Sequence, residues 1–192
     1  MAIRGDGVFY KTGIILVSMI VLILIGGFAL PSTFSVKRSI EIEAPASEVF
    51  EHIADYQRWN KWDPWLAKDN SLQARIEGSP GVGQSLIWSS GGQETGRCEL
   101  LESELPNRLA MNITFRNSDS PHQTQFLLSH EGGKTTVVWT LTGQNGMQPI
   151  GNYFGLLMDS FVGGMFGHGL SRLKRLVETG NADAPKAAPA EG

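Results

Sequence analysis

The stretch RSIEIEAPASEVFEHIADYQRWNKWDPW (Arg38–Trp65) contains the pattern that decides the fold. The segment Val36–Glu43 alternates apolar and polar side chains, which is typical of a strand with one buried face. Pro45 then begins a short helix, whose apolar positions continue to Ala54. A tryptophan-rich link, Tyr56–Trp65, completes the stretch. This part of the chain therefore predicts a strand, a short helix and a second short helical segment in succession.

The rest of the chain predicts six further strands and one long helix. Turn signals rich in glycine and proline separate strands over Leu72–Glu77, Gln84–Ser89, Thr95–Glu102, Arg108–Arg116, Gln123–His130 and Thr135–Thr142. The long helix is expected over Ile150–Glu178. It is the only predicted element outside the N-terminus long enough to cover one face of a seven-stranded sheet. We therefore predict an α+β fold, in which a curved antiparallel sheet wraps around the C-terminal helix and encloses a cavity.

The N-terminal segment predicts a membrane anchor. No charged residue occurs between Lys11 and Lys37, and the 18 residues Gly13–Leu30 are almost entirely apolar. A helix of this length measures about 27 Å, close to the ~30 Å hydrocarbon core of a bilayer. The alternative is a signal peptide cleaved after Ala29, but the apolar run exceeds the usual length of a signal h-region. Flanking charges are nearly balanced, and we favour a single-pass protein with an exported domain.

Composition limits the remaining function classes. The net charge of −3 argues against nucleic-acid binding. The single cysteine excludes an intramolecular disulfide and a multi-cysteine zinc site, and no histidine spacing suggests a metal, so neither cofactor nor metal is expected. Gly26 and Gly27 do not form a GxxxG motif, so a monomer is expected. The expected organisation is a flank (1–12), an anchor (13–30), one domain (34–178) and a disordered, Ala/Pro-rich tail (179–192).

Residues 34–178 resemble the START/SRPBCC superfamily, and within it the polyketide cyclase/dehydrase-like branch. The resemblance is carried by four stretches in order: Arg38–Trp65 quoted above, GVGQSLIW (Gly81–Trp88), TTVVWTLTG (Thr135–Gly143) and HGLSRLKRLVE (His168–Glu178). It implies a helix-grip fold that binds an apolar or amphipathic small molecule in its cavity. It does not imply one reaction, because the superfamily includes lipid carriers, ring-closing enzymes and domains without a known ligand.

Alternation in the strands and helical spacing in the long helix suggest which side chains line the cavity. They are Trp88, Met111, Phe115, Phe126, Trp139, Leu157, Phe161 and Met165. Trp62 and Trp65 are expected at the cavity mouth, with plain packing of the link against the sheet as the alternative. No catalytic motif is present, so His168 and Asp159 are the candidate polar groups, each with an ordinary structural role as the alternative.

The long helix contains six glycines, each of which costs about 1 kcal/mol relative to alanine. Six glycines could be explained if the helix lies very close to the sheet. Otherwise, they suggest that the helix is kinked or movable near Gly163 and Gly164 and gates the cavity. The sequence as a whole favours a membrane-tethered domain that binds a lipid or related metabolite. A cyclase-, dehydrase- or hydrolase-type enzyme is the second hypothesis, and a protein-interaction module with a vestigial cavity is the third.

Overall fold

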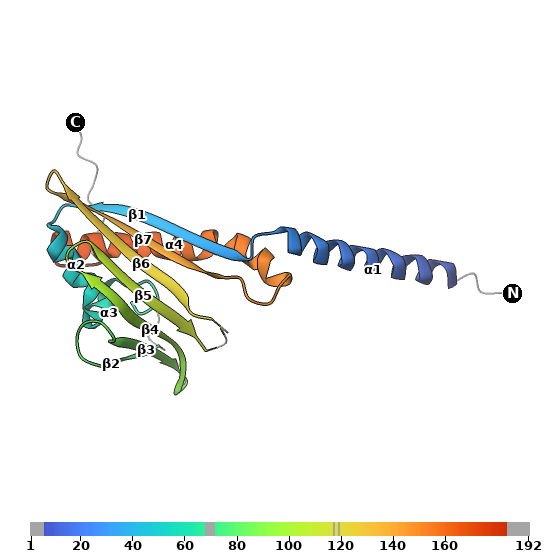
Figure 1. Ribbon diagram of the computed structural model, residues 1–192, viewed down its shortest axis with the longest axis horizontal. Coiled ribbons are helices and arrows are strands. Elements are labelled where there is room, and N and C mark those ends of the chain that lie inside the picture. The colour runs from blue at the N-terminus through green and yellow to red at the C-terminus, as the bar shows by residue number, and fades with distance from the viewer. Residues whose placement is uncertain (1–5, 68–71, 117, 119, 184–192) are drawn as a thin grey trace.

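The computed structural model describes residues 6–67, 72–116, 118 and 120–183. Its elements follow the predicted order, with α1 extending away from the rest of the chain (Figure 1). The helices are α1 (Asp6–Ala29), α2 (Ala46–Ala54), the short 3-10 helix η1 (Tyr56–Arg58), α3 (Trp59–Trp62) and α4 (Ile150–Thr179). The strands are β1 (Thr33–Ile42), β2 (Gln73–Glu77), β3 (Ser85–Ser90), β4 (Gln93–Glu104), β5 (Arg108–Phe115), β6 (His122–Glu131) and β7 (Lys134–Gln144).

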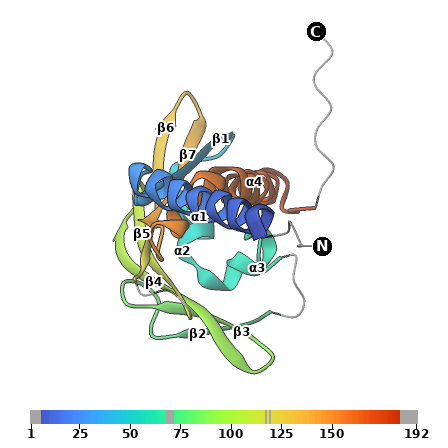
Figure 2. The same cartoon turned by 90° about the vertical axis from the view of Figure 1, so that its right-hand side faces the viewer.

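The seven strands form one antiparallel sheet in the order β1-β7-β6-β5-β4-β3-β2. Strands β2 to β7 pair with their neighbours in sequence, whereas β1 pairs with the last strand, β7. Register shifts between Trp88 and Ser89 and between Leu100 and Glu102 interrupt the ladders of β3 and β4. Such irregularities bend strands. The sheet curves around α4, with α2 and α3 beside that helix (Figure 2). This is the predicted helix-grip fold.

The core lies between the concave face of the sheet and α4. On β1 the even-numbered residues point inward, and Val36 and Ile42 are fully buried. From α4, Phe166, Leu170 and Leu173 meet them across the core. Full burial of one such aliphatic or aromatic side chain contributes about 1.5–3 kcal/mol. The long helix is therefore fixed to the sheet mainly by its C-terminal half.

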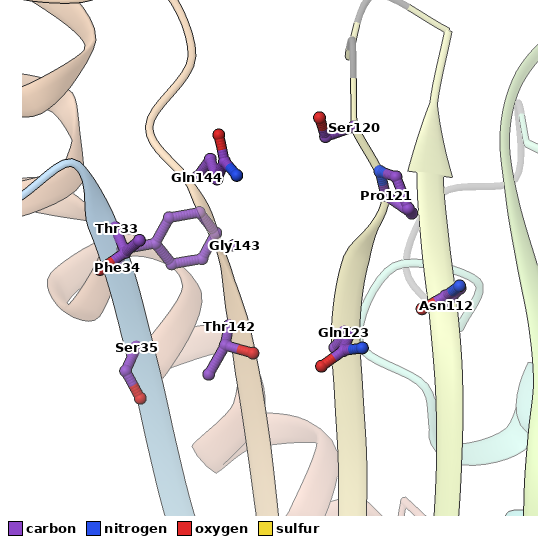
Figure 3. A pocket seen from close by; sticks show the side chains of 10 residues that line it. All are labelled: Thr33, Phe34, Ser35, Asn112, Ser120, Pro121, Gln123, Thr142, Gly143 and Gln144. Carbon is purple, nitrogen blue, oxygen red and sulfur yellow. The ribbon is translucent and has the colours of Figure 1, made fainter.

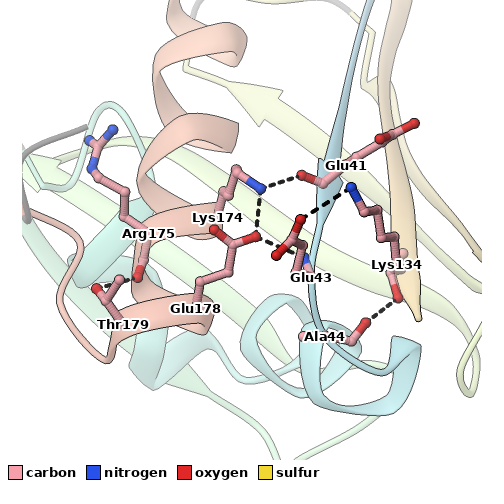
Figure 4. Close-up of polar contacts among 9 residues, drawn as sticks. Glu41, Glu43, Ala44, Lys134, Lys174, Arg175, Glu178 and Thr179 are labelled. Carbon is pink, nitrogen blue, oxygen red and sulfur yellow. Dashed lines mark hydrogen bonds and ion pairs between the residues drawn. The ribbon is translucent and has the colours of Figure 1, made fainter. Parts of the chain in front are cut away.

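Polar contacts reinforce this attachment at the C-terminal end of α4 (Figure 4). The Lys174 ammonium donates to the Glu41 carbonyl at 2.8 Å and pairs with Glu178. Glu178 in turn accepts from the backbone N–H of Glu43 at 2.7 Å. Lys134, at the β6–β7 turn, pairs with the Glu43 carboxylate at 3.1 Å. These contacts join the end of α4 to the end of β1 and to the neighbouring hairpin.

The glycines of α4 are explained mainly by close packing. The helix runs without interruption from Ile150 to Thr179. A side chain would collide with a neighbour at four of the six positions: Gly151 and Gly155 against Asn145, Gly163 against the Arg38 guanidinium, and Gly169 against Pro64. At Gly164 and Gly167 the added carbon would meet no neighbour within 4 Å. Close packing against β1, the link and the loop before α4 thus accounts for four of the six glycines, and a kink near Gly163 and Gly164 that gates the cavity stays a hypothesis.

The residues just after the expected end of the domain at 178 also contact it. Helix α4 ends at Thr179, and Gly180 adopts the left-handed conformation that ends many helices. Ala182 is buried, and its carbonyl accepts from the Arg175 guanidinium at 2.8 Å. The first residues of the predicted disordered tail therefore pack on the domain, whereas residues 184–192 lie outside the described part of the chain.

The end of α1 is joined to the start of α4. The Asn152 side chain, which is buried, donates to the Gly27 carbonyl at 2.9 Å. The Tyr153 hydroxyl donates to the Ile23 carbonyl at 2.7 Å. A Cβ atom on Gly26 would lie only 2.7 Å from this hydroxyl, so glycine allows the two helices to approach. The 20 residues Tyr10–Ala29 of α1 form a helix that is long and apolar enough to cross a membrane. A signal sequence near the N-terminus would have the same length and hydropathy, so these two properties do not distinguish an anchor from a signal sequence.

Candidate functional site

An apolar cavity of about 290 Å³ lies between α4, the α3 link and the concave face of the sheet. Side chains from α4, from the link and from five strands surround it. They are Trp59, Asp63, Trp65, Leu66, Leu72, Leu86, Trp88, Thr95, Cys98, Ile113, Phe115, His122, Thr124, Trp139, Leu141, Met158, Val162 and Phe166.

Trp139 forms the centre of the cavity wall. Its indole ring stacks on Phe166 of α4, with ring centroids 3.7 Å apart and planes inclined by 7°. Its Nε1–H donates to the Thr124 hydroxyl at 2.8 Å, and that hydroxyl donates to the Thr140 carbonyl at 3.1 Å. Because these polar groups are paired with one another, this wall presents an apolar surface.

Strand β3 and helix α4 form two further parts of the wall. On β3, Trp88 lies directly against Gly96 of β4, where any side chain would collide with its indole ring. Glycine at this position therefore allows a tryptophan to lie flat on the sheet. On α4, Met158, Val162 and Phe166 follow one another at intervals of four residues and share the face that points toward the sheet.

Asp63 is a carboxylic acid at the edge of the cavity. It is buried, and its Oδ1 accepts from the backbone N–H groups of Trp65 and Leu66 at 3.0 and 2.9 Å. Burial raises the pKa of Asp63 to about 6, and the two backbone hydrogen bonds oppose that rise. The residue therefore shapes the turn after α3 and also places a titratable carboxyl beside an apolar space.

The remaining titratable lining groups are neutral. Burial raises the pKa of the Cys98 thiol to about 12, and its sulfur lies 3.6 Å from the Tyr56 hydroxyl. Burial also lowers the pKa of His122, whose Nδ1 is buried without a hydrogen-bond partner. A protonated thiol is a poor nucleophile, and a neutral imidazole suits an apolar surrounding. The chemistry of the cavity is therefore mainly that of a hydrophobic binding site.

A family profile described as "polyketide cyclase / dehydrase and lipid transport" matches residues 33–178, most of the chain. The chain belongs to this polyketide cyclase/dehydrase and lipid transport family. A search of curated proteins gave no match.

Solved structures show the same fold as this family member. A protein from Thermobifida fusca is 22% identical, with a TM-score of 0.56 over 74% of this chain and 92% of that one. Protein CV1439 from Chromobacterium violaceum is 18% identical, with a TM-score of 0.52 over 78% and 99%. DynU16, from the dynemicin biosynthetic locus, is 18% identical, with a TM-score of 0.56 over 77% of this chain. The chain spans about half, 48%, of DynU16.

The side chains expected to line the cavity of this family member fall into three groups. Trp88, Phe115 and Trp139 line it. Met111 and Phe126 are buried in the core and are not among its lining residues. The three residues expected from α4 are also not lining residues: Leu157 and Phe161 are exposed, and Met165 is partly buried.

The two tryptophans expected at the mouth have different positions. Trp62 is fully buried, contacts Phe126 and Trp139, and donates its Nε1–H to the His52 carbonyl at 3.1 Å. It packs the link against the sheet and does not line the cavity. Trp65 lines the cavity and is 38% exposed, so it lies at the rim. Phe115, which is 42% exposed, also contributes to the rim.

The candidate catalytic residues lie on α4 but are not cavity-lining residues. Asp159 is exposed and pairs with Arg38 of β1 at 2.7 Å, and the hydrogen bond from Arg38 lowers the pKa of the Asp159 carboxyl. His168 is also exposed. Among the described residues, no group of three or more His, Cys, Asp or Glu side chains could hold a metal ion. Asp63 and His122 instead supply a carboxyl group and an imidazole to the cavity lining.

The sequence contains a signal for several lining residues that are absent from the predicted set. His122 and Thr124 share the inward parity of Phe126 on β6. Met158 and Val162 occur one position after Leu157 and Phe161, so α4 has two adjacent apolar stripes. For Asp63, a polar side chain next to proline indicated a turn, and its burial at a cavity had no local signal.

A second, open concavity lies on the outer sheet face of this family member (Figure 3). Its floor is a row of aligned polar side chains from four adjacent strands, namely Ser35, Thr142, Gln123 and Asn112. This polar and open surface contrasts with the apolar cavity on the other side of the sheet. The enclosed cavity is therefore the better candidate for recognition of a hydrophobic molecule.

Proposed function

We propose that the chain is a membrane-tethered protein whose domain binds a hydrophobic or amphipathic small molecule, such as a lipid or related metabolite. The observation that carries the proposal is the cavity of about 290 Å³ with its mainly aromatic and aliphatic lining. Ligand pockets usually measure ~300–1,000 Å³, so this one suits a small apolar molecule or part of a longer chain. The family description, which includes lipid transport, supports the same function.

The contacts at the end of α1 support retention of this helix as a single-pass anchor. Cleavage after Ala29 would remove the carbonyl groups of Ile23 and Gly27, which accept from Tyr153 and Asn152. The buried Asn152 amide would lose that partner, a loss that costs about 1–3 kcal/mol. The intact mass of the mature chain tests retention: the full chain has a mass of 20.9 kDa, and a cleaved chain would be lighter. We place the domain on the exported side, which protease accessibility in intact cells tests.

Ligand binding is tested by blocking the cavity in the full chain. Val162→Trp places an indole in the cavity, whereas Leu156→Trp places one on an exposed part of the same helix. The proteins are purified in detergent, and their bound molecules are compared by native mass spectrometry and organic extraction. We expect a molecule that is present in the wild type and in Leu156→Trp and is lost in Val162→Trp.

Lipid held by α1 does not disturb this comparison, because all three proteins contain the same helix. Equal amounts of every extracted molecule in the three proteins would contradict binding in the cavity. A cavity that is empty in all three would favour a protein-interaction module.

An enzyme is the second candidate function, favoured by Asp63. A carboxyl group with a pKa of about 6 at the edge of an apolar cavity can accept or donate a proton near neutral pH. Asp63→Asn distinguishes the two functions, since a binder keeps its ligand and an enzyme fails to convert it. Mass spectrometry of the bound molecule before and after incubation measures that conversion.

A further inference from the structure

The N-terminal half of α4 exposes a continuous apolar stripe. Ile150, Phe154, Leu157 and Phe161 follow one another at spacings of four, three and four residues, which places them on one face of the helix. All four are exposed, with Phe154 at 65% and Phe161 at 78%. Met147, in the loop before the helix, is 82% exposed. Contiguous exposed apolar surface of this kind marks an interaction site.

The start of this stripe lies beside the last turns of α1. Tyr153, next to Phe154 in the chain, bonds to the carbonyl of Ile23, which is six residues before the end of α1 at Ala29. Six residues correspond to about 9 Å along a helix axis. The first turns of α4 therefore overlap the end of the apolar helix rather than beginning beyond it. The views of Figures 1 and 2 agree in placing the start of α4 next to α1.

The surface formed by the two helices and the loop before α4 is uncharged and mainly apolar in this region, with Gln144 and Gln148 as its exposed polar side chains. Helix α1 exposes its own side chains, including Phe28 at its end. No charged residue occurs between Lys134 and Asp159 in the sequence, a segment that contains the loop and the first turns of α4. Ion pairs and charged side chains instead hold the far end of α4. Continuity with the apolar surface of α1 favours lipid over a second protein as the partner of the stripe.

The stripe also adjoins the cavity. Met158 and Val162, which line the cavity, directly follow Leu157 and Phe161 on the helix. The cavity residues Phe115 and His122 come from the end of β5 and the start of β6, at the end of the sheet nearest α1 (Figure 1). A molecule that leaves the bilayer beside α4 thus has a short path to the cavity.

We propose that the N-terminal half of α4 and the preceding loop insert into the bilayer interface beside α1 and hold the cavity mouth against lipid. The proposal rests on the function proposed above, because it requires α1 to span the membrane. Apolar side chains of amphipathic helices are buried in this way at the boundary between headgroups and acyl chains. The occupant of the stripe is the acyl region of the bilayer, which is also the source of the ligand.

The test measures the depth of single labelled sites in the full chain, reconstituted in vesicles of phosphatidylcholine and phosphatidylglycerol. Cysteine is introduced singly as Phe154→Cys on the stripe, Ile20→Cys within α1 and Ser129→Cys on the exposed outer face of β6. The native Cys98 is buried, and its thiol pKa is raised to about 12, so a thiol-reactive bimane labels the introduced site selectively. Quenching by a lipid-borne nitroxide is compared with quenching by aqueous iodide.

We expect the lipid nitroxide to quench Phe154→Cys and Ile20→Cys several-fold more than Ser129→Cys, and iodide to show the reverse order. Quenching of Phe154→Cys by iodide, with Ile20→Cys still quenched by lipid, would overturn insertion while leaving the tether intact. Quenching of Ile20→Cys by iodide would overturn the tether and insertion together. Protection of Phe154→Cys from both quenchers would show that protein covers the stripe and would also overturn the proposal.

Discussion

Asp63 is a buried acid whose titration should be visible in the stability of the protein. An unfolded aspartate loses its proton near pH 3.8, whereas burial raises the pKa of folded Asp63 to about 6. Between these values the folded state binds more protons, so the free energy of unfolding falls as pH rises from about 4 to about 6. The loss attributable to Asp63 is of order 3 kcal/mol at most, since one pKa unit corresponds to about 1.4 kcal/mol.

Asp63→Asn should remove this dependence while keeping the Oδ1 acceptor for Trp65 and Leu66. Urea unfolding of the full chain across this pH range measures the difference between variant and wild type. Exposed Glu131→Gln is the control for general charge effects. If the free energy of unfolding changed with pH in the same way in wild type and Asp63→Asn, Asp63 would have the same pKa in the folded and unfolded states.

At the scale of the element, α4 provides a matched pair of glycine substitutions. Gly164→Ala should stabilise the protein by about 1 kcal/mol, because alanine favours the helix and its methyl group meets no neighbour. Gly163→Ala should stabilise it less than Gly164→Ala does, because the methyl group would push the Arg38 guanidinium, the end of a flexible side chain, away from Asp159. Thermal unfolding of the two variants and the wild type measures both effects.

The same pair tests whether α4 gates the cavity. If flexibility at this point controls ligand exchange, Gly164→Ala should slow the exchange of the extracted ligand as well as raise the melting temperature. A higher melting temperature with unchanged exchange would reject gating. The contact of Gly163 with the Arg38 guanidinium would then be the remaining explanation for glycine at that position.

The elements themselves were largely predictable, whereas the face of α4 that borders the cavity was not. Alternation and turn signals together located all seven strands, because a half-buried strand imposes a period of two on its own sequence and glycine and proline mark the turns between strands. Helical spacing selected Leu157 and Phe161, but Met158 and Val162 one position later line the cavity. Both stripes are apolar, so the sequence offers no contrast in polarity that distinguishes the cavity-lining face of α4 from the exposed one. The rotation of α4 depends on tertiary contacts such as Gly163 on Arg38, which sequence periodicity does not contain.

At the scale of the whole molecule, the junction between α1 and α4 should determine how the domain is oriented relative to α1. Asn152 is central to this junction, because its buried side chain donates to the Gly27 carbonyl and accepts from Asn145 at 3.3 Å. Asn152→Ala removes both hydrogen bonds and leaves the Gly27 carbonyl without that donor, at a cost of about 1–3 kcal/mol. The fold of the domain should survive, since its core lies at the other end of α4.

The expected result of Asn152→Ala is a looser junction. Spin labels on Ile20→Cys in α1 and Ser129→Cys in β6 report the distribution of distances between helix and domain. That distribution should broaden in Asn152→Ala, whereas exposed Gln148→Ala in the adjacent loop should leave it unchanged. An equally narrow distribution in both variants would mean that Tyr153 and the apolar contacts alone fix the orientation. A broad distribution in Asn152→Ala alone would instead make one buried amide the reason that the domain keeps a constant orientation relative to α1.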